Sequence, residues 1–445
     1  MQFLRNRSWT AGSAAHILEG SKDHCLVDKP YIRREHSVSV ARILEDAREL
    51  HDDVVQLRHD LHRHPELGLD LPRTQEKVLE AISDLPLEIT LGKSLTSVGA
   101  VLRGTAGDPS AVDRPTVLLR ADMDALPLQE ETGVDFASTV PNRMHACGHD
   151  LHTSMLVGAA RLLAERRHQL AGDVVLMFQP AEEQLAGAPM MIEEGILELS
   201  GRQADAAYGL HVFSAGGNTG RFETKAGVMM SAADALFVKV IGRGGHGSAP
   251  HQAKDPVPVM AEMIVGLQHM VTRQFNAHDP VVVSVGMVKA GEAINVIPDT
   301  AEFGASLRMY SDEARTKMQS AIPRLLKGIA SAHGLEVDIN YHVGGRVTIT
   351  DAAHTAFAAE QIHELFGAER HHSLPAPLGG SEDFADVLAR VPGSFICLDA
   401  TPLGVGPDAA FNHSPRATFD DSVLVDGTAL YTQLAVARLA QLAAA

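Results

Sequence analysis

The chain has 445 residues, of which 45% are hydrophobic and 21% are charged, and its formal net charge is −18. This length exceeds one ordinary hydrophobic core and fits two domains, while the acidic balance argues against a basic nucleic-acid-binding surface. Three widely separated cysteines fit a reducing compartment better than a disulfide framework, and no apolar run is long enough to span a bilayer. We therefore expect a cytoplasmic globular protein without a nucleic-acid or membrane partner.

The first forty residues lack the apolar segment of a secretory signal, so we expect residues 1–40 to form an N-terminal extension. From Ser37 onward apolar residues recur at helical spacing as far as the sequence HPELG, where Pro65 and Gly68 end the helix. A second helix is predicted over residues 73–85. The chain therefore opens with helices before its first strand.

Short apolar runs that end in polar residues then alternate with helical segments. The runs are PTVLLRADMD (115–124), GDVVLMFQPAEE (172–183), ADAAYGLHV (204–212) and GSFICLDA (393–400), and helices are predicted over 152–170 and 422–445. Continuous Val, Leu and Ile runs predict strands buried on both faces. The alternation predicts an α/β fold with a mainly parallel sheet and flanking helices. A site in such a sheet lies beyond the carboxyl ends of its strands.

Between residues 234 and 345 the order of elements changes to βαββαβ, the ferredoxin-like arrangement. We therefore predict a catalytic, metal-binding domain formed by residues 41–233 and 346–445. Residues 234–345 are predicted to form an inserted domain that acts as a lid or a dimerisation surface.

A dinuclear metal site needs roughly four to six protein ligands gathered from several strand ends. Residues of ligand type lie just after predicted strands or in loops that enter helices; these are Cys147, His149, Glu183, His211 and His413. Thiolate, imidazole and carboxylate together suit zinc, manganese, cobalt or nickel. Taken singly, each residue also has an ordinary explanation, such as a buried thiol, a surface histidine or a glutamate favoured by a helix dipole.

A redox role for Cys147 is disfavoured because no second cysteine lies near it in the sequence. A cysteine-protease role is disfavoured because no protease signature surrounds it. The glycine-rich blocks GRGGHG and LGGSED lack the spacing of phosphate-binding loops.

Several long blocks occur in a fixed order from about residue 41 to the C-terminus: LRADMDALPLQEETG, MHACGHDLHT, FQPAEE, YGLHV, GRGGHGSAPH, INVIPD, GGSEDF and NHSP. In this the chain resembles the amidohydrolase branch of the dinuclear metallopeptidase and aminoacylase superfamily. That branch includes hippurate hydrolases, N-acyl-amino-acid amidohydrolases and auxin–amino acid conjugate hydrolases. The resemblance implies a catalytic domain of that superfamily with an inserted ferredoxin-like domain.

The resemblance also implies roles for individual residues. Cys147 would bridge two divalent ions, which are expected to be manganese or zinc, with cobalt or nickel as alternatives. His149, Glu183, His211 and His413 would complete the ligand set. Glu182, which precedes the ligand glutamate, would act as the general base.

Further residues would act around this centre. In the family a histidine and an asparagine of the inserted domain reach the active site of a partner subunit. His246 would therefore donate to the oxyanion, with Asn295 beside it, in a homodimer or higher homo-oligomer. Arg308 would bind the substrate carboxylate, although an arginine on a strand often has a structural role. Asp122 and Asp124 would orient the ligands, or form a turn at the end of a strand.

The predicted activity is metal-dependent cleavage of N-acyl amino acids to a carboxylic acid and a free amino acid. The acyl group could be acetyl, benzoyl, indoleacetyl or longer. The alternatives are a dipeptidase or carboxypeptidase with the same dinuclear site, an inactive relative that serves as a binding protein, and a purely structural zinc protein. The segments LDLPRT, TSVG and FICLDATPLG depart from the family pattern around the substrate, so substrate preference is left open.

Overall fold

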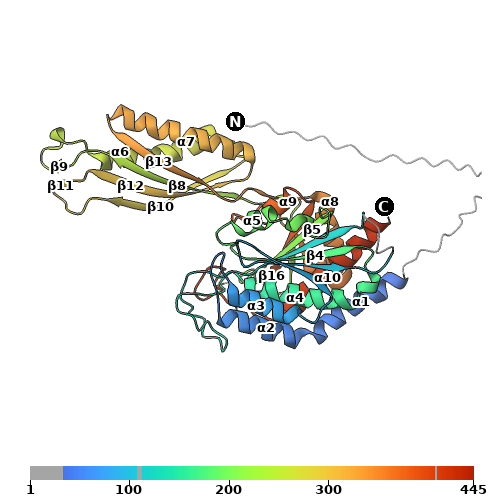
Figure 1. Ribbon diagram of the computed structural model, residues 1–445. Coiled ribbons are helices and arrows are strands. Elements are labelled where there is room, and N and C mark those ends of the chain that lie inside the picture. Colours follow the sequence, from blue (N-terminus) through green and yellow to red (C-terminus); the bar gives the residue numbers. More distant parts are fainter. Residues whose placement is uncertain (1–33, 108–112, 406–407, 445) are drawn as a thin grey trace, which may run out of the picture.

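The computed structural model describes residues 34–107, 113–405 and 408–444 (Figure 1). The predicted N-terminal extension therefore lies mostly outside the described residues. The largest sheet has eight strands in the order β1-β2-β4-β3-β5-β16-β6-β15. In that order the strands span Leu87–Leu91, Val98–Arg103, Asp173–Gln179, Thr116–Asp122, Ala206–Phe213, Gly393–Asp399, Phe222–Thr224 and His371–Ser373.

The centre of this sheet is parallel. Strands β4, β3, β5 and β16 run in the same direction, whereas β1 and β2 pair antiparallel at one edge. Every residue of β3, β4 and β16 is buried, as expected for strands that are covered on both faces. The predicted α/β class with a mainly parallel sheet is therefore confirmed.

Helices cover both faces of the sheet. Val117 and Leu119 of β3 belong to one hydrophobic core, while Leu118 between them belongs to another, because successive side chains of a strand point to opposite faces. The first core includes residues from α1 (Arg34–Glu49), α2 (His51–Arg63), α3 (Pro72–Ile82), α4 (His149–Glu165), α8 (Ala352–Phe366) and α10 (Val423–Ala443). The second includes residues from α5 (Gly187–Glu193) and α9 (Ala385–Leu388).

The predicted first helix is divided at Leu50 into α1 and α2. Ile43 and Ala47 before this point and Val54 after it all contact the same core. The apolar periodicity therefore continues across the division, so the sequence pattern does not reveal it.

A second sheet of four strands stands apart from the main body in Figure 1. Its chain order is β8 (Ala232–Ile241), α6 (Pro256–Gln274), β10 (Val281–Ala290), β12 (Thr300–Met309), α7 (Asp312–Ala332) and β13 (Glu336–Val343). The strand order β10-β12-β8-β13 is wholly antiparallel, and α6 and α7 share a separate hydrophobic core with it. The elements of this unit run from Ala232 to Val343, and its predicted limits at residues 234 and 345 stay a proposal.

Smaller elements complete the fold. They are β7 (Gly227–Met230), which pairs with β14 (Thr348–Thr350), β9 (Gly245–His246), which pairs with β11 (Val296–Ile297), and the short 3-10 helices Arg167–Gln169, Ile196–Glu198, Pro250–Gln252 and Ala368–Arg370. Among the helices of the described ranges, none has the length and apolar character to cross a membrane.

Candidate metal centre

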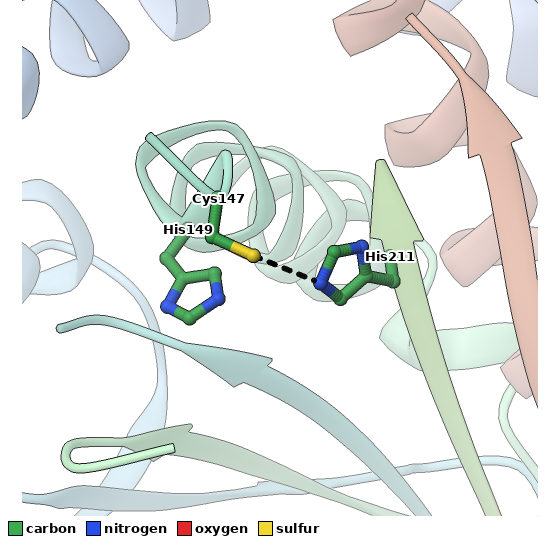
Figure 2. A group of neighbouring side chains, drawn as sticks. All are labelled: Cys147, His149 and His211. Carbon is green, nitrogen blue, oxygen red and sulfur yellow. Dashed lines mark hydrogen bonds between the residues drawn. The ribbon is translucent and has the colours of Figure 1, made fainter. Parts of the chain in front are cut away.

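The start of helix α4 places a thiol and an imidazole side by side. Gly148 precedes the helix with a left-handed backbone (φ +88°), and a Cβ at this position would lie 2.3 Å from Cγ2 of Val212. Only glycine fits such a conformation and so close a contact. As a result Cys147 and His149, on either side of it, lie near His211 of β5, as Figure 2 shows.

The five predicted ligands form two groups that share Cys147. Its Sγ lies 3.4 Å from Nε2 of His211 and 3.3 Å from Nε2 of His413. Nε2 of His413 is in turn 3.4 Å from a carboxylate oxygen of Glu183. One group is Cys147, His149 and His211, and the other is Cys147, Glu183 and His413, each with its ligand atoms within 4.8 Å of one another. A thiol common to both groups is the arrangement expected of a bridging ligand.

The donors in these groups fit divalent cations. Nε2 of His149 and one carboxylate oxygen of Glu183 are buried without a hydrogen-bond partner, which is unfavourable unless another group satisfies them. Burial lowers the pKa of His211 well below its usual value, so the ring is neutral and able to act as a ligand. Burial and then Glu183 raise the pKa of the Cys147 thiol, so a cation is needed to hold it as a thiolate.

Asp124 fixes the glutamate pair. Its two carboxylate oxygens accept hydrogen bonds from the backbone N–H groups of Glu182 (3.0 Å) and Glu183 (3.1 Å). Its backbone carbonyl lies 2.9 Å from Nδ1 of His149. Asp124 therefore contacts the ring of the predicted ligand His149 and holds the backbone of both glutamates, which suits the orienting role proposed for it.

Glu182 lies beside the ligands, almost completely buried. One of its carboxylate oxygens is 3.9 Å from Nε2 of His149. Burial, followed by the neighbouring carboxyl groups of Glu382 and Glu183, raises the pKa of Glu182 well above its usual value. A carboxyl with a raised proton affinity suits a group that accepts a proton during catalysis.

Left-handed backbone conformations gather at this centre. Ala181 (φ +57°), Leu185 (φ +53°) and His413 (φ +68°) are three of the four described non-glycine residues with positive φ. Such conformations are strained for residues with a Cβ and concentrate at functional sites.

A buried ionic network that the sequence did not reveal supports the centre. Arg120, fully buried in β3, donates hydrogen bonds to Asp122 (2.6 Å), Glu382 (2.7 Å) and Asp383 (3.0 Å). Carboxylate oxygens of Glu382 and Asp383 lie within 4.8 Å of one in Glu182. A charged residue inside an apolar strand was the only local sign of this network, because a buried charge requires partners.

His152 was not among the residues predicted to contribute to the site, yet it lies next to them in the structure. Its Nδ1 lies 2.6 Å from a carboxylate oxygen of Asp122, and its Nε2 accepts the backbone N–H of Val212 (2.7 Å), the residue after the predicted ligand His211. The same Asp122 carboxylate lies 3.7 Å from Nε2 of His149. Spacing could have indicated this residue, since positions three apart share one face of a helix.

The residues predicted to act across a dimer lie elsewhere. His246 and Asn295 are both exposed and neighbour each other, with the carbonyl of Asn295 accepting the N–H of Gly247 (2.9 Å). Figure 1 shows β9 and β11 at the end of the four-stranded unit that is remote from the large sheet. A single subunit therefore does not bring His246 to its own metal centre, and the role in a partner's site stays a prediction.

Arg308 of β12 lies near the loop that follows Glu183, not near His246 and Asn295. It lines an open groove of about 560 Å³ whose wall also includes Leu185, two residues after Glu183. Its Nη1 donates to the carbonyl of Leu307 (3.1 Å), which leaves other guanidinium donors for a ligand. The groove therefore connects the predicted carboxylate-binding arginine with the loop that carries the glutamate pair.

A parallel α/β sheet with thiol, imidazole and carboxylate donors gathered beyond its strand ends defines a metalloenzyme. Residues 118–437 match the family described as peptidase family M20/M25/M40. The chain belongs to this family, and it is a metal-dependent amidohydrolase.

Named relatives cover nearly the whole chain. Hippurate hydrolase of Campylobacter jejuni is 36% identical over 88% of this chain and 98% of its own length. IAA-amino acid hydrolase ILR1-like 2 of Arabidopsis thaliana is 34% identical over 92% of this chain and 91% of its own length. Thermostable carboxypeptidase 1 of Saccharolobus solfataricus is 32% identical over 89% of this chain and 98% of its own length.

A solved structure agrees with the fold. The Bacillus subtilis YXEP protein, described as a dinuclear metal-binding peptidase of the M20 family, has a TM-score of 0.73 and 31% identity. The similarity covers 88% of this chain and 99% of that protein.

Proposed function

We propose that this amidohydrolase cleaves the amide bond of N-acyl amino acids and releases a carboxylic acid and a free amino acid. The observation that carries the proposal is the pair of ligand groups sharing Cys147, with the buried carboxyl of Glu182 beside them. Relatives named for the hydrolysis of hippurate and of indoleacetic acid conjugates support the same substrate class.

Cys147, His149, Glu183, His211 and His413 would hold two divalent ions, with manganese or zinc expected first and cobalt or nickel as alternatives. When bound, such ions polarise the amide carbonyl and make hydroxide available near neutral pH. The residues of the chain then supply orientation and proton transfer.

Glu182 would take the proton from the attacking water and deliver it to the leaving nitrogen. Asp124 keeps this carboxylate in place because it holds the backbone N–H groups of both Glu182 and Glu183. Arg308, in the groove next to Leu185, would bind the carboxylate of the amino-acid part of the substrate. His246 and Asn295 of a second subunit would complete the site around the oxyanion.

The reaction class is tested with a panel of N-acyl amino acids and free dipeptides. The enzyme is chelated, and amino-acid release is measured before and after manganese, zinc, cobalt or nickel is returned. Metal-restored cleavage of N-acyl substrates supports the proposal. Failure of every panel member, with two ions bound per subunit, would contradict it and favour the binding-protein alternative.

Two variants separate the roles of the adjacent glutamates. Glu182→Gln should keep the bound metal and reduce kcat by roughly 10²–10⁴-fold, because only proton transfer is removed. Glu183→Gln should reduce the metal content itself. Glu198→Gln, an exposed carboxylate outside the centre, serves as the control. Near wild-type turnover in Glu182→Gln would mean that another group is the base.

The homodimer is tested by complementation. Subunits carrying His246→Ala are mixed with subunits carrying Glu182→Gln, so that some mixed dimers contain one site with both residues intact. Recovery of activity supports the contribution of His246 across the interface. No recovery in verified mixed dimers would contradict it.

The alternative is a dipeptidase or carboxypeptidase with the same dinuclear site, and the 32% identical relative named thermostable carboxypeptidase 1 gives it weak support. A dipeptidase prefers a free ammonium group on its substrate, whereas the proposed activity requires an acylated nitrogen. Acylating the amino group of a test dipeptide therefore separates the two: faster cleavage of the acylated form supports the amidohydrolase, and slower cleavage supports the dipeptidase.

A further inference from the structure

An arginine-lined cavity lies at the end of the large sheet opposite the metal centre. Its volume is about 340 Å³, and its wall includes Arg103, Arg114, Arg167 and Arg202. Thr116 and Asp173, the first residues of the parallel strands β3 and β4, also line it. Because the metal ligands follow the carboxyl ends of these strands, the cavity is separate from the catalytic centre.

Two of the arginines are held in place by one carboxylate. Asp173 accepts from Nη1 of Arg103 (2.7 Å) and from Nε of Arg114 (3.3 Å). Arg114 is buried and also donates to the carbonyl of Gly104 (2.8 Å). These guanidinium groups are therefore fixed by packing and hydrogen bonds before any ligand arrives, which lowers the entropy lost on binding.

The other two arginines differ in their partners. Arg202 forms an ion pair with Asp205, with hydrogen bonds of 2.5 and 2.9 Å. Arg167 donates only through Nε, to the carbonyl of Arg103 (2.6 Å), and no carboxylate of the described chain forms an ion pair with it. The terminal nitrogens of Arg167 therefore keep their donors for a ligand in the cavity.

The local charge is opposite to that of the whole chain. Among the described residues, the four guanidinium groups lie near the carboxylates of Asp173, Asp205 and Glu88, and the Glu88 side chain is 62% exposed. The described side chains around the cavity therefore carry more positive than negative charge, in a chain whose formal net charge is −18. A built cluster of arginines in an acidic protein favours an anion with several oxygens, since planar guanidinium groups bind such oxyanions in pairs of hydrogen bonds.

We propose that this cavity binds a phosphate-class oxyanion, either inorganic phosphate or the phosphomonoester group of a small metabolite. The terminal nitrogens of Arg167 bind the oxygens directly, and Arg103 and Arg114 supply the surrounding positive charge. A volume of about 340 Å³ is at the lower end of the range of roughly 300–1,000 Å³ found for small-ligand sites, which fits such a group. The site is independent of the hydrolytic reaction proposed above.

The test is calorimetric titration of the metal-loaded full chain at constant ionic strength, with inorganic phosphate and with glycerol 3-phosphate. Because phosphate also binds metal ions, the result is read from variants of the cavity and not from binding alone. Arg167→Gln should weaken binding of the tighter probe about tenfold or more through the loss of a charge-assisted hydrogen bond. Arg167→Lys should recover part of it, and Arg202→Gln is the second variant if Arg167→Gln does not fold.

Arg243→Gln is the matched control, because Arg243 also donates one hydrogen bond to a backbone carbonyl, that of Gln252, and lies outside the cavity. Its affinity should equal that of the wild type. A lower Kd for inorganic phosphate identifies free phosphate as the ligand. A lower Kd for glycerol 3-phosphate identifies a phosphorylated metabolite, and either result supports the site. Equal affinity in the wild type and the cavity variants, or no saturable binding of either probe up to about 10 mM, would overturn it.

Discussion

Replacing Arg120 by methionine tests the buried network beneath the metal centre. Arg120 is fully buried and donates to the carboxylates of Asp122, Glu382 and Asp383 and to Oε1 of Gln179. Methionine fills a similar volume but leaves three carboxylates without their cation. Breaking a buried ion pair in this way costs about 3–5 kcal/mol. At about 2–4 °C per kcal/mol for a large domain, Tm should fall by roughly 10 °C.

The pH dependence of the loss shows whether charge is the cause. Burial alone would raise the pKa of Asp122, yet Arg120 and the nearby histidines hold it well below its usual value. In the variant this pKa rises, so protonation relieves the repulsion and the stability difference from the wild type shrinks as pH falls from about 8 toward 5. Thermal unfolding followed by circular dichroism at several pH values measures this. A shift under about 2 °C, or a difference that does not change with pH, would refute the reasoning.

Three further predictions follow from single features. Gly148→Ala forces a Cβ against Val212 in a left-handed backbone, so it should destabilise the chain by about 2–4 kcal/mol and lower its metal content; unchanged metal content by elemental analysis would contradict this. Chelation should lower Tm, and returned metal should restore it. At a free metal concentration of about one hundred times Kd, bound metal adds about 2.7 kcal/mol to the free energy of unfolding. An unchanged Tm in both states would mean that the folded centre does not bind the ion. Burial and then Arg438 lower the pKa of His354 to about 4 from its usual 6.5, so the folded state binds fewer protons and stability falls as pH drops from 6.5 to 4. His354→Asn should flatten that part of the profile measured by urea unfolding, and an identical slope would exclude the histidine as its source.

The strands that carry the site were predictable because they are buried on both faces. The runs that became β3, β4, β5 and β16 are continuous in apolar residues. Edge strands gave no such signal: four of the five residues of β1 are exposed, and β6 and β15 have three residues each. Their place depends on pairing with distant segments, which a local pattern does not encode.

The five predicted ligand positions rested on strand ends and on the family motifs, and the structure places them in two groups that share Cys147. The network around Arg120 could not be predicted from the sequence, because Arg120 and its partner Glu382 are 262 residues apart in the chain. No spacing rule connects such positions. The pair of Glu382 and Asp383 stood inside the recognised block GGSEDF, yet only the packed sheet shows that it faces Glu182.

The two ends of the four-stranded unit leave the large body side by side. The N–H of Ala233 donates to the carbonyl of Gly345 (3.0 Å), and β7 and β14 next to them form a short ladder. Because its two ends are adjacent, the unit is an insertion that a short turn could replace without moving the strands of the large sheet. Under the roles proposed for His246, Asn295 and Arg308, exchange of this unit between relatives would alter the residues around the substrate and leave the large sheet unchanged. Chimeras joined at this ladder would therefore test whether the four-stranded unit sets the substrate preference.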